Sequence, residues 1–256
     1  MRVVVRKGGY FFFIVFFLLS TFNSALCSED AEMKEHSWSF KGIFGTYDRS
    51  SLRRGFQIYS EVCSGCHSMN YLHYRDLSAI GYTPDEIETI AAEFEIENII
   101  DKNGDLSSRA ATPADKFVDP YLSDELAIEA NGALPPDLSL IVKARKGGAN
   151  YLYALLTGYQ KAPDGFKLTE GLYYNRAISG NQIAMPPPFS DDIVEYEDGA
   201  PATVDQLAKD IVVFLAWAAE PEMEERKKLG IRVIIFLSVL TILLAFIKRK
   251  VWEKLK

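Results

Sequence analysis

The pentapeptide CSGCH at 63–67 constrains this chain more than any other stretch, because it holds two thiols and an imidazole within a few residues. The whole chain contains only three cysteines, so a pair at this spacing points to a shared role. Apolar residues at spacings of three and four precede the motif and predict that it lies on a helix. On one helical face, Cys63 and Cys66 would point in the same direction, with His67 beside the second thiol. The motif therefore predicts a three-point binding site for one flat ligand.

Several kinds of site use cysteines at this spacing. A thiol–disulfide redox motif expects a strand-to-helix context, which this helical sequence does not supply. A zinc site needs four ligands, and the only other histidines are His36 and His73. A disulfide between Cys63 and Cys66 is poorly placed within one helix. Covalent attachment of a c-type haem accounts for all three residues, because the thiols would form thioethers and His67 would bind the iron.

A haem iron held by His67 has a second axial position, and Met185 is the best candidate for it. Met185 lies in NQIAMPPPF, where three prolines fix the backbone and remove amide donors. Met69 is too close to His67 in the sequence to reach the opposite side of a haem. The alternative for Met185 is ordinary packing in a core. A His/Met pair would close both axial positions, which favours electron transfer over oxygen or peroxide chemistry.

The N-terminal segment has the composition of a secretory signal. Residues 1–27 begin with three cations, continue with an apolar run and end in small and polar residues. We expect cleavage after Ala25 or Cys27, and the alternative is an uncleaved anchor. A signal of this type favours the inner membrane of a bacterial cell over a mitochondrion.

A second apolar segment lies at the far end of the chain. Residues 229–247 would reach about 28 Å as a helix, close to the hydrocarbon core of about 30 Å. The cations in 248–256 place the C-terminus on the cytoplasmic side. We therefore predict a single-pass protein of three parts. They are a signal peptide at 1–27, a periplasmic haem domain at 28–225, and a membrane anchor with a short cytoplasmic tail at 226–256.

The charge of the predicted periplasmic part is strongly negative. Residues 28–225 contain 16 basic and 34 acidic residues, an excess of 18 acids. Acidic side chains cluster at 83–97 and 190–199. Such a charge excludes nucleic acid as a partner and favours a basic protein, although part of it serves to solvate helix faces and loops.

Helical patterns dominate the rest of the sequence, and long connections rich in Gly and Pro separate them. The expected starts are Ser50 or Ser51 before the motif, and then Thr83, Asp137 and Thr203. A short buried helix is expected at 150–159, ending at Gly158. Strand patterns are few, and residues 98–120 match no pattern. These features predict a mainly α fold.

Long stretches of the chain resemble the cytochrome c1 family, the membrane-anchored haem subunits of cytochrome bc1 complexes. They are RRGFQIYSEVCSGCHSMNY (53–71), NGALPPDLSLIVKARKGGANYLYALLTGY (131–159), LTEGLYYN (168–175), IAMPPPF (183–189) and DGAPATVDQLAKDIVVFLAWAAEPEMEERKKLG (198–230). The resemblance covers nearly the whole mature chain. It implies a cytochrome c-type haem domain with long loop insertions and one C-terminal transmembrane helix.

The same resemblance implies the residues that would hold one haem c: Cys63 and Cys66 as covalent attachment points, with His67 and Met185 as axial ligands. It also implies that Arg145 lies near a haem propionate and that Tyr151 and the Pro135–Pro136 turn line the pocket. Two alternatives stay open. A cation suits the C-terminal end of a helix dipole, and a tyrosine in NYLYALL packs equally well in a core.

A role in respiratory electron transport follows from the resemblance. The iron–sulfur (Rieske) protein would deliver one electron to the haem, which would pass it to a basic cytochrome c, while cytochrome b and membrane lipid hold the subunit in place. The chain would break no substrate bond, so it would not be an enzyme on its own. The alternatives are a membrane-tethered cytochrome c that feeds an oxidase, and a haem peroxidase with an open distal site.

Overall fold

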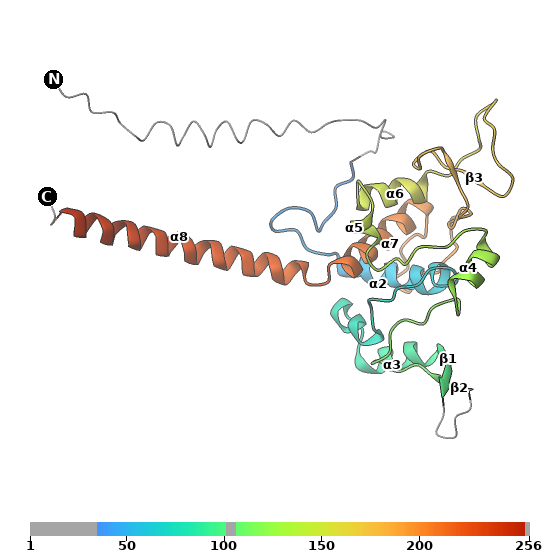
Figure 1. The fold of residues 1–256 in the computed structure, drawn as a ribbon, viewed down its shortest axis with the longest axis horizontal. Coiled ribbons are helices and arrows are strands. Elements are labelled where there is room, and N and C mark those ends of the chain that lie inside the picture. Colours follow the sequence, from blue (N-terminus) through green and yellow to red (C-terminus); the bar gives the residue numbers. More distant parts are fainter. Residues whose placement is uncertain (1–34, 101–105, 254–256) are drawn as a thin grey trace. The chain divides into compact units, whose positions relative to one another are not determined.

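In a computed structural model of the chain, residues 35–100 and 106–253 are described (Figure 1). In chain order the elements are α2 (Arg49–Ile58), the π-helical turn η1 (Tyr59–Cys63), the 3-10 helix η2 (Tyr74–Ile80), α3 (Pro84–Ala92), β1 (Glu95–Ile100), β2 (Leu106–Ala110), α4 (Asp124–Asn131), α5 (Ile141–Ala144), α6 (Ala149–Thr157), β3 (Tyr173–Tyr174), β4 (Gln182–Ile183), α7 (Val204–Ala219) and α8 (Met223–Glu253). The fold is mainly α, as the sequence predicts. The expected signal peptide at 1–27 lies outside the described residues.

The core forms where α2 packs against α7. Most of α7 is buried, and Leu207, Phe214 and Trp217 lose nearly all contact with solvent. The two helices approach each other closely at Gly55, where an added Cβ would lie 2.3 Å from the carbonyl oxygen of Asp210 and 2.6 Å from the Cβ of Phe214. Glycine therefore allows a backbone approach that any larger residue would prevent.

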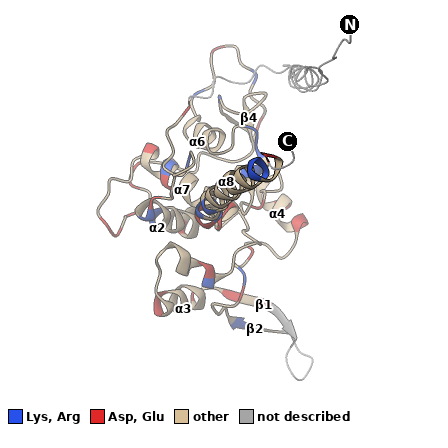
Figure 2. Ribbon diagram, turned by 90° about the vertical axis from the view of Figure 1, so that its left-hand side faces the viewer, with Lys and Arg blue, Asp and Glu red and all other residues tan. Residues whose placement is uncertain are grey.

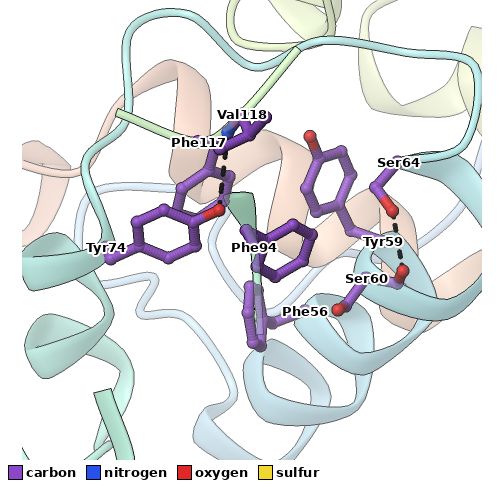
Figure 3. A pocket seen from close by; sticks show the side chains of 8 residues that line it. All are labelled: Phe56, Tyr59, Ser60, Ser64, Tyr74, Phe94, Phe117 and Val118. Atoms are coloured by element: carbon purple, nitrogen blue, oxygen red, sulfur yellow. Dashed lines mark hydrogen bonds between the residues drawn. The ribbon is translucent and has the colours of Figure 1, made fainter. Parts of the chain in front are cut away.

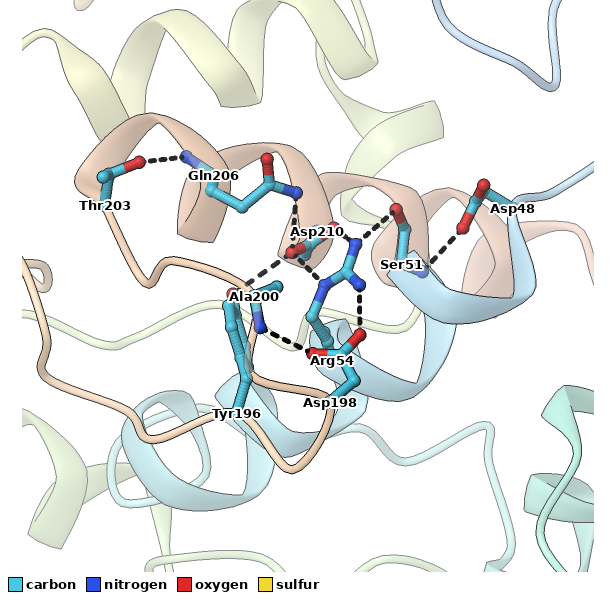
Figure 4. Close-up of polar contacts among 9 residues, drawn as sticks. All are labelled: Asp48, Ser51, Arg54, Tyr196, Asp198, Ala200, Thr203, Gln206 and Asp210. Carbon is cyan, nitrogen blue, oxygen red and sulfur yellow. Dashed lines mark hydrogen bonds and ion pairs between the residues drawn. The ribbon is translucent and has the colours of Figure 1, made fainter.

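A buried ion pair joins the same two helices (Figure 4). Asp210 on α7 is fully buried, and both of its carboxylate oxygens accept hydrogen bonds from Arg54 on α2, at 2.8 and 3.1 Å. The Tyr196 hydroxyl and the Gln206 amide also donate to Asp210, at 3.2 and 3.0 Å. Arg54 in turn binds Asp198 at 2.7 Å. The buried charge is thus fully paired, and it ties the loop before α7 to both helices.

The expected helix starts at Thr83 and Thr203 are confirmed. Each hydroxyl accepts from the backbone N–H three residues later, at the first turns of α3 and α7. The start of α2 differs from the expectation of Ser50 or Ser51, because Asp48 is the capping residue and accepts from the backbone N–H of Ser51 at 2.8 Å. The charge on an aspartate carboxylate strengthens such an N-cap hydrogen bond relative to that of a serine hydroxyl.

Residues 98–120, which matched no pattern, include part of a hairpin and a return to the core. Strands β1 and β2 pair antiparallel, with an irregularity between Ile96 and Ile99. The chain then passes back beside η2. There Tyr74 N–H donates to the backbone carbonyl of Asp115, and Phe117 N–H donates to the backbone carbonyl of Leu72. Phe117 is buried among the core aromatics.

Helix α8 is one continuous element of 31 residues, about 46 Å long at about 1.5 Å per residue. Among the described residues it is the one helix long and apolar enough to cross a membrane, and its most apolar window is not buried inside the protein. Figure 2 shows Lys and Arg at both ends of α8, and the stretch 233–247 between them carries no charge. The expected membrane span at 229–247 lies wholly within it.

Candidate haem site

The α-helix that precedes the CSGCH motif ends earlier than the apolar spacing predicts. The α-helical pattern of α2 ends at Ile58, a π-helical turn carries the chain to Cys63, and Cys66 lies in the turn that follows. The prediction that both thiols share an α-helical face is therefore wrong. Two hydrogen bonds to the carbonyl oxygen of Cys63 still hold the motif together, from Cys66 N–H at 3.1 Å and His67 N–H at 2.9 Å.

The imidazole of His67 is oriented by one backbone contact. Its Nδ1 lies 2.8 Å from the carbonyl oxygen of Pro136. Because a carbonyl only accepts, Nδ1 carries the proton and Nε2 keeps its lone pair. Desolvation lowers the pKa of His67 and outweighs the opposing effects of Pro136 and Asp137. A neutral imidazole with a fixed tautomer is what metal ligation requires.

Pro136 is held in position by the residue that follows it. The Asp137 carboxylate accepts from Asn70 N–H at 2.8 Å, from the Ser68 hydroxyl at 3.1 Å and from Ser139 N–H at 2.7 Å. Burial acts to raise the pKa of Asp137, but these hydrogen bonds hold it below its usual value. Leu138 N–H completes the contact by donating to the Ser68 carbonyl at 2.9 Å.

Asp137 does not begin a helix, contrary to the prediction. The short helix α5 starts at Ile141, and its N-cap residue Leu140 makes no side-chain cap. Asp137 instead binds its own chain two residues on, at Ser139, and bridges to the segment after His67. An aspartate in this local turn competes with helix formation.

The two thiols have different surroundings. Cys63 packs against the core cluster, and desolvation, with a smaller contribution from Cys66, raises the pKa of the Cys63 thiol to about 12. Cys66 is exposed, and both cysteines are free. The structure therefore does not support a redox-active or structural disulfide between Cys63 and Cys66.

The residues around the motif fit a haem. Large apolar side chains beside the His67 segment remain exposed: Tyr71, Leu134 and Leu140. Together with two free thiols and a neutral imidazole, they offer apolar surface and iron ligation to one flat, largely apolar ligand. The zinc alternative is not supported, since His73 Nδ1 lies 3.6 Å from Asp76 and His36 stacks on Tyr153.

An aromatic cluster supports the motif from the core side (Figure 3). Tyr59, the first residue of the π-helical turn, is buried, and its hydroxyl donates to the His67 carbonyl at 3.2 Å. Its ring stacks on Phe117, which in turn lies 4.8 Å from the ring of Tyr74. Desolvation raises the pKa of Tyr59 and keeps the hydroxyl protonated as a donor. These contacts fix the turn that carries Cys63.

Met185 is held by residues that sequence reasoning did not single out. The Tyr159 hydroxyl donates to the Met185 carbonyl at 3.1 Å. Tyr159 forms a β-bridge with Asn175, which is fully buried and donates to the Leu155 carbonyl at 2.7 Å. The half-buried Met185 is thereby attached to the end of α6. Its approach to an iron opposite His67 stays a prediction.

The other predicted pocket residues are less constrained. Pro136 is the one that the structure joins directly to His67. Arg145 is exposed and directly follows α5, a position that also suits the helix dipole. Tyr151 on α6 is half-buried against the core cluster. Contacts of Arg145 and Tyr151 with a haem stay predictions.

Comparisons with known proteins agree over most of the chain. A model described as the Cytochrome C1 family matches residues 38–255. Cytochrome c1 of Rhodospirillum rubrum is 46% identical over 241 residues, which cover 88% of this chain and 89% of that protein. A mitochondrial cytochrome c1 heme protein of Arabidopsis thaliana is 46% identical over 243 residues, 93% of this chain and 79% of that protein. That of Saccharomyces cerevisiae is 46% identical over 223 residues, covering 86% and 72%.

Proposed function

This chain belongs to the cytochrome c1 family, and on that basis we propose that it carries one covalently bound haem c and passes single electrons from a Rieske iron–sulfur protein to a cytochrome c. The family implies a haem cofactor and a place in a cytochrome bc1 complex, beside cytochrome b and the Rieske protein. The subunit has no reaction of its own, and the quinol–cytochrome c oxidoreductase activity belongs to the complex.

The observation that carries the proposal is the hydrogen bond between His67 Nδ1 and the Pro136 carbonyl. It leaves Nε2 as a lone-pair donor in a motif whose neighbouring thiols are free. A structural histidine in a core would not need that fixed tautomer beside two unpaired cysteines.

Each residue of the site then has a distinct task. Cys63 and Cys66 would hold the haem by thioethers, and His67 would bind and orient it through the iron. Met185 would supply the second iron ligand, and its thioether would raise the potential and keep oxygen and peroxide from the metal. When bound, haem supplies a reversible one-electron couple. The protein contributes position, potential and a surface for docking.

We assign the parts of the chain to compartments in the same way. Residues 1–27 act as a signal peptide and residues 28–225 form a periplasmic domain. Residues 226–256, which hold most of α8, anchor this domain in the bacterial inner membrane as a single pass with a cytoplasmic end. The 18-residue excess of acids over bases in 28–225 attracts a basic cytochrome c.

Purification from native membranes tests the proposal. The full chain should copurify with b-type haem, and the preparation should reduce cytochrome c with quinol in a Rieske-dependent manner. A chain that purifies with haem c but without b-type haem, and that reduces an oxidase instead, would be the tethered cytochrome of the first alternative.

Binding of carbon monoxide distinguishes the proposal from the second alternative, a haem peroxidase with an open distal site. With Met185 on the iron, the native reduced protein should bind carbon monoxide poorly. Ready binding, together with a high-spin spectrum, would assign the chain to ligand-binding or peroxidase chemistry.

A further inference from the structure

A short loop before α2 holds two large apolar side chains away from the protein. Ile43 and Phe44 are 70% and 82% exposed. The loop is closed at its base, because Thr46 N–H donates to the Ser39 carbonyl at 3.1 Å. The turn is also tight at Gly45, where the backbone leaves no room for a side chain, since an added Cβ would lie 2.1 Å from the carbonyl oxygen of Lys41. The exposure of the tip is thus built into an ordered turn.

The loop is fastened to the first turns of α8. Lys227 Nζ donates to the carbonyl oxygens of Phe40 and Gly45, at 2.7 and 3.0 Å. Just beyond the loop, Tyr47 N–H donates to Glu224 at 2.9 Å, and Arg49 pairs with the same carboxylate at 2.8 Å. The loop therefore lies beside the start of α8 (Figure 1).

Lys227, which binds the loop, lies close to the apolar part of α8 that we assign to the membrane. Lys227 is two residues before Leu229, where the apolar span begins, and six residues before the uncharged stretch at 233–247. Six residues correspond to about 9 Å along the helix. A loop at this level of the helix meets the boundary between headgroups and acyl chains.

We propose that Ile43 and Phe44 insert into the outer-leaflet interface of the bilayer and form a second membrane contact beside α8. Lipid is the occupant that the surroundings favour, because Lys227 fastens the loop to α8 just before its apolar span, and the most apolar window of that span is not buried in the protein. The exposed Lys41 at the base of the loop suits phosphate headgroups.

A second membrane contact would fix the orientation of the domain, which a single spanning helix does not. A single spanning helix leaves its domain free to tilt and to rotate about the helix axis. Ile43 and Phe44 in the same interface fix one orientation of the domain, and with it the height and direction of the CSGCH site relative to the membrane plane. The inference goes beyond electron transfer and does not depend on the identity of the electron donor or acceptor.

Lipid crosslinking tests the contact. The haem-loaded full chain is placed alone in nanodiscs of phosphatidylcholine and phosphatidylglycerol that include a lipid with a diazirine on its acyl chain. After irradiation and trypsin digestion, adducts are mapped by mass spectrometry. The peptide 42–49 contains Ile43 and Phe44, and the peptide 117–143 contains Leu122, which is 65% exposed and serves as the reference. We expect about tenfold more adducts on the first peptide. Equal yields on the two would overturn the proposal.

Matched variants distinguish insertion from proximity. Phe44→Asp should lower the loop adducts about tenfold while adducts on α8 and the haem spectrum stay unchanged. Leu122→Asp, with the same change of chemistry on another exposed residue, should leave the loop adducts as they are. The haem spectrum and thermal melting report that both variants fold.

A protein partner is the other possible occupant, and the same loop reports it. If the isolated chain gives no loop adducts, and hydroxyl-radical labelling of Phe44 falls only in the complex with the other subunits, the loop is a subunit interface and the membrane contact is wrong.

Discussion

At the scale of single residues, the site depends on contacts that cross long stretches of chain. Pro136 orients His67 and Asp137 binds Asn70, in each case over nearly seventy residues of sequence. The motif itself predicts His67 and both thiols, because their chemistry is local. The role of Asp137 is not predictable in this way. Its residue type suits a helix start as well as a local turn, and the sequence does not say which distant segment the carboxylate reaches.

Removing the Asp137 carboxylate should destabilise the site. Asp137→Ala leaves the N–H groups of Asn70 and Ser139 and the Ser68 hydroxyl without their acceptor, so we expect a loss of about 1–3 kcal/mol in the free energy of unfolding. Urea denaturation measures it, with Asp164→Asn on an exposed loop as the control. An equal stability of the two variants would contradict the bridging role.

Met185→Leu tests the predicted axial ligand. The leucine keeps the size of the side chain but removes the sulfur, so the haem should stay attached while its potential falls. The fall should be a sizeable part of the range of about 0.8 V that axial ligands control. Redox titration with optical detection measures it, and an unchanged potential would remove Met185 from the iron. Met69→Leu, a buried methionine next to the motif, is the control and should leave the potential close to that of the native protein.

At the scale of elements, helix starts with local caps are predictable and the way elements meet is not. Thr83 and Thr203 cap within three residues, so their sequence suffices. The π-helical turn that ends at Cys63 is not predicted, because its apolar spacing also suits an α-helix. The hairpin of β1 and β2 is not predicted because a register irregularity between Ile96 and Ile99 breaks the alternation that would mark the strands.

Gly55→Ala should weaken the packing of α2 on α7. The added methyl group overlaps the Asp210 carbonyl oxygen and the Phe214 Cβ, neither of which moves without shifting a helix. Overpacking of this kind costs about 1–3 kcal/mol. Gly65→Ala is the control, because nothing lies within 4 Å of its added Cβ. Thermal unfolding compares the two, and a melting temperature of Gly55→Ala equal to that of the control would show that the helices separate without cost.

The cap of α3 should depend on pH. The hydrogen bond from Thr83 N–H, followed by the contact with Arg53, lowers the pKa of Glu86 to about 2. A lowered pKa in the folded state means that the carboxylate stabilises the fold above its unfolded pKa, near 4.5, and that this stabilisation is lost as the pH falls from there towards 2. Glu86→Gln, which lacks the charge, should therefore be less stable than the native chain at pH 7, and the difference between them should be much smaller at pH 2.5. Urea midpoints at both values measure the difference, and a gap that does not narrow contradicts the assignment.

At the scale of the whole molecule, the distribution of charge and hydropathy predicts most of the organisation. The apolar segment before the C-terminal cations becomes α8, and its uncharged centre is visible in Figure 2. Whole-chain patterns of this kind depend on composition alone. They do not predict that Lys227 and Glu224 hold the chain before α2 against α8, because those contacts join residues about 180 apart.

The acidic surface should make association with a basic cytochrome c strongly dependent on salt. Residues 28–225 carry 18 more acids than bases, and Figure 2 shows Asp and Glu on several elements, α3 and α4 among them. A field of this sign accelerates encounter with a cation by about tenfold or more, and salt screens it as the Debye length falls from about 30 Å at 0.01 M to about 8 Å at 0.15 M. Stopped-flow reduction of a basic cytochrome c by the prereduced complex should therefore slow by about that factor over this range. Reduction of the same site by an uncharged hydroquinone is the control and should change little, since only the encounter between charged proteins depends on the field. A basic cytochrome c whose rate stays constant with salt would show that docking uses a neutral patch, and the acids would then serve solvation alone.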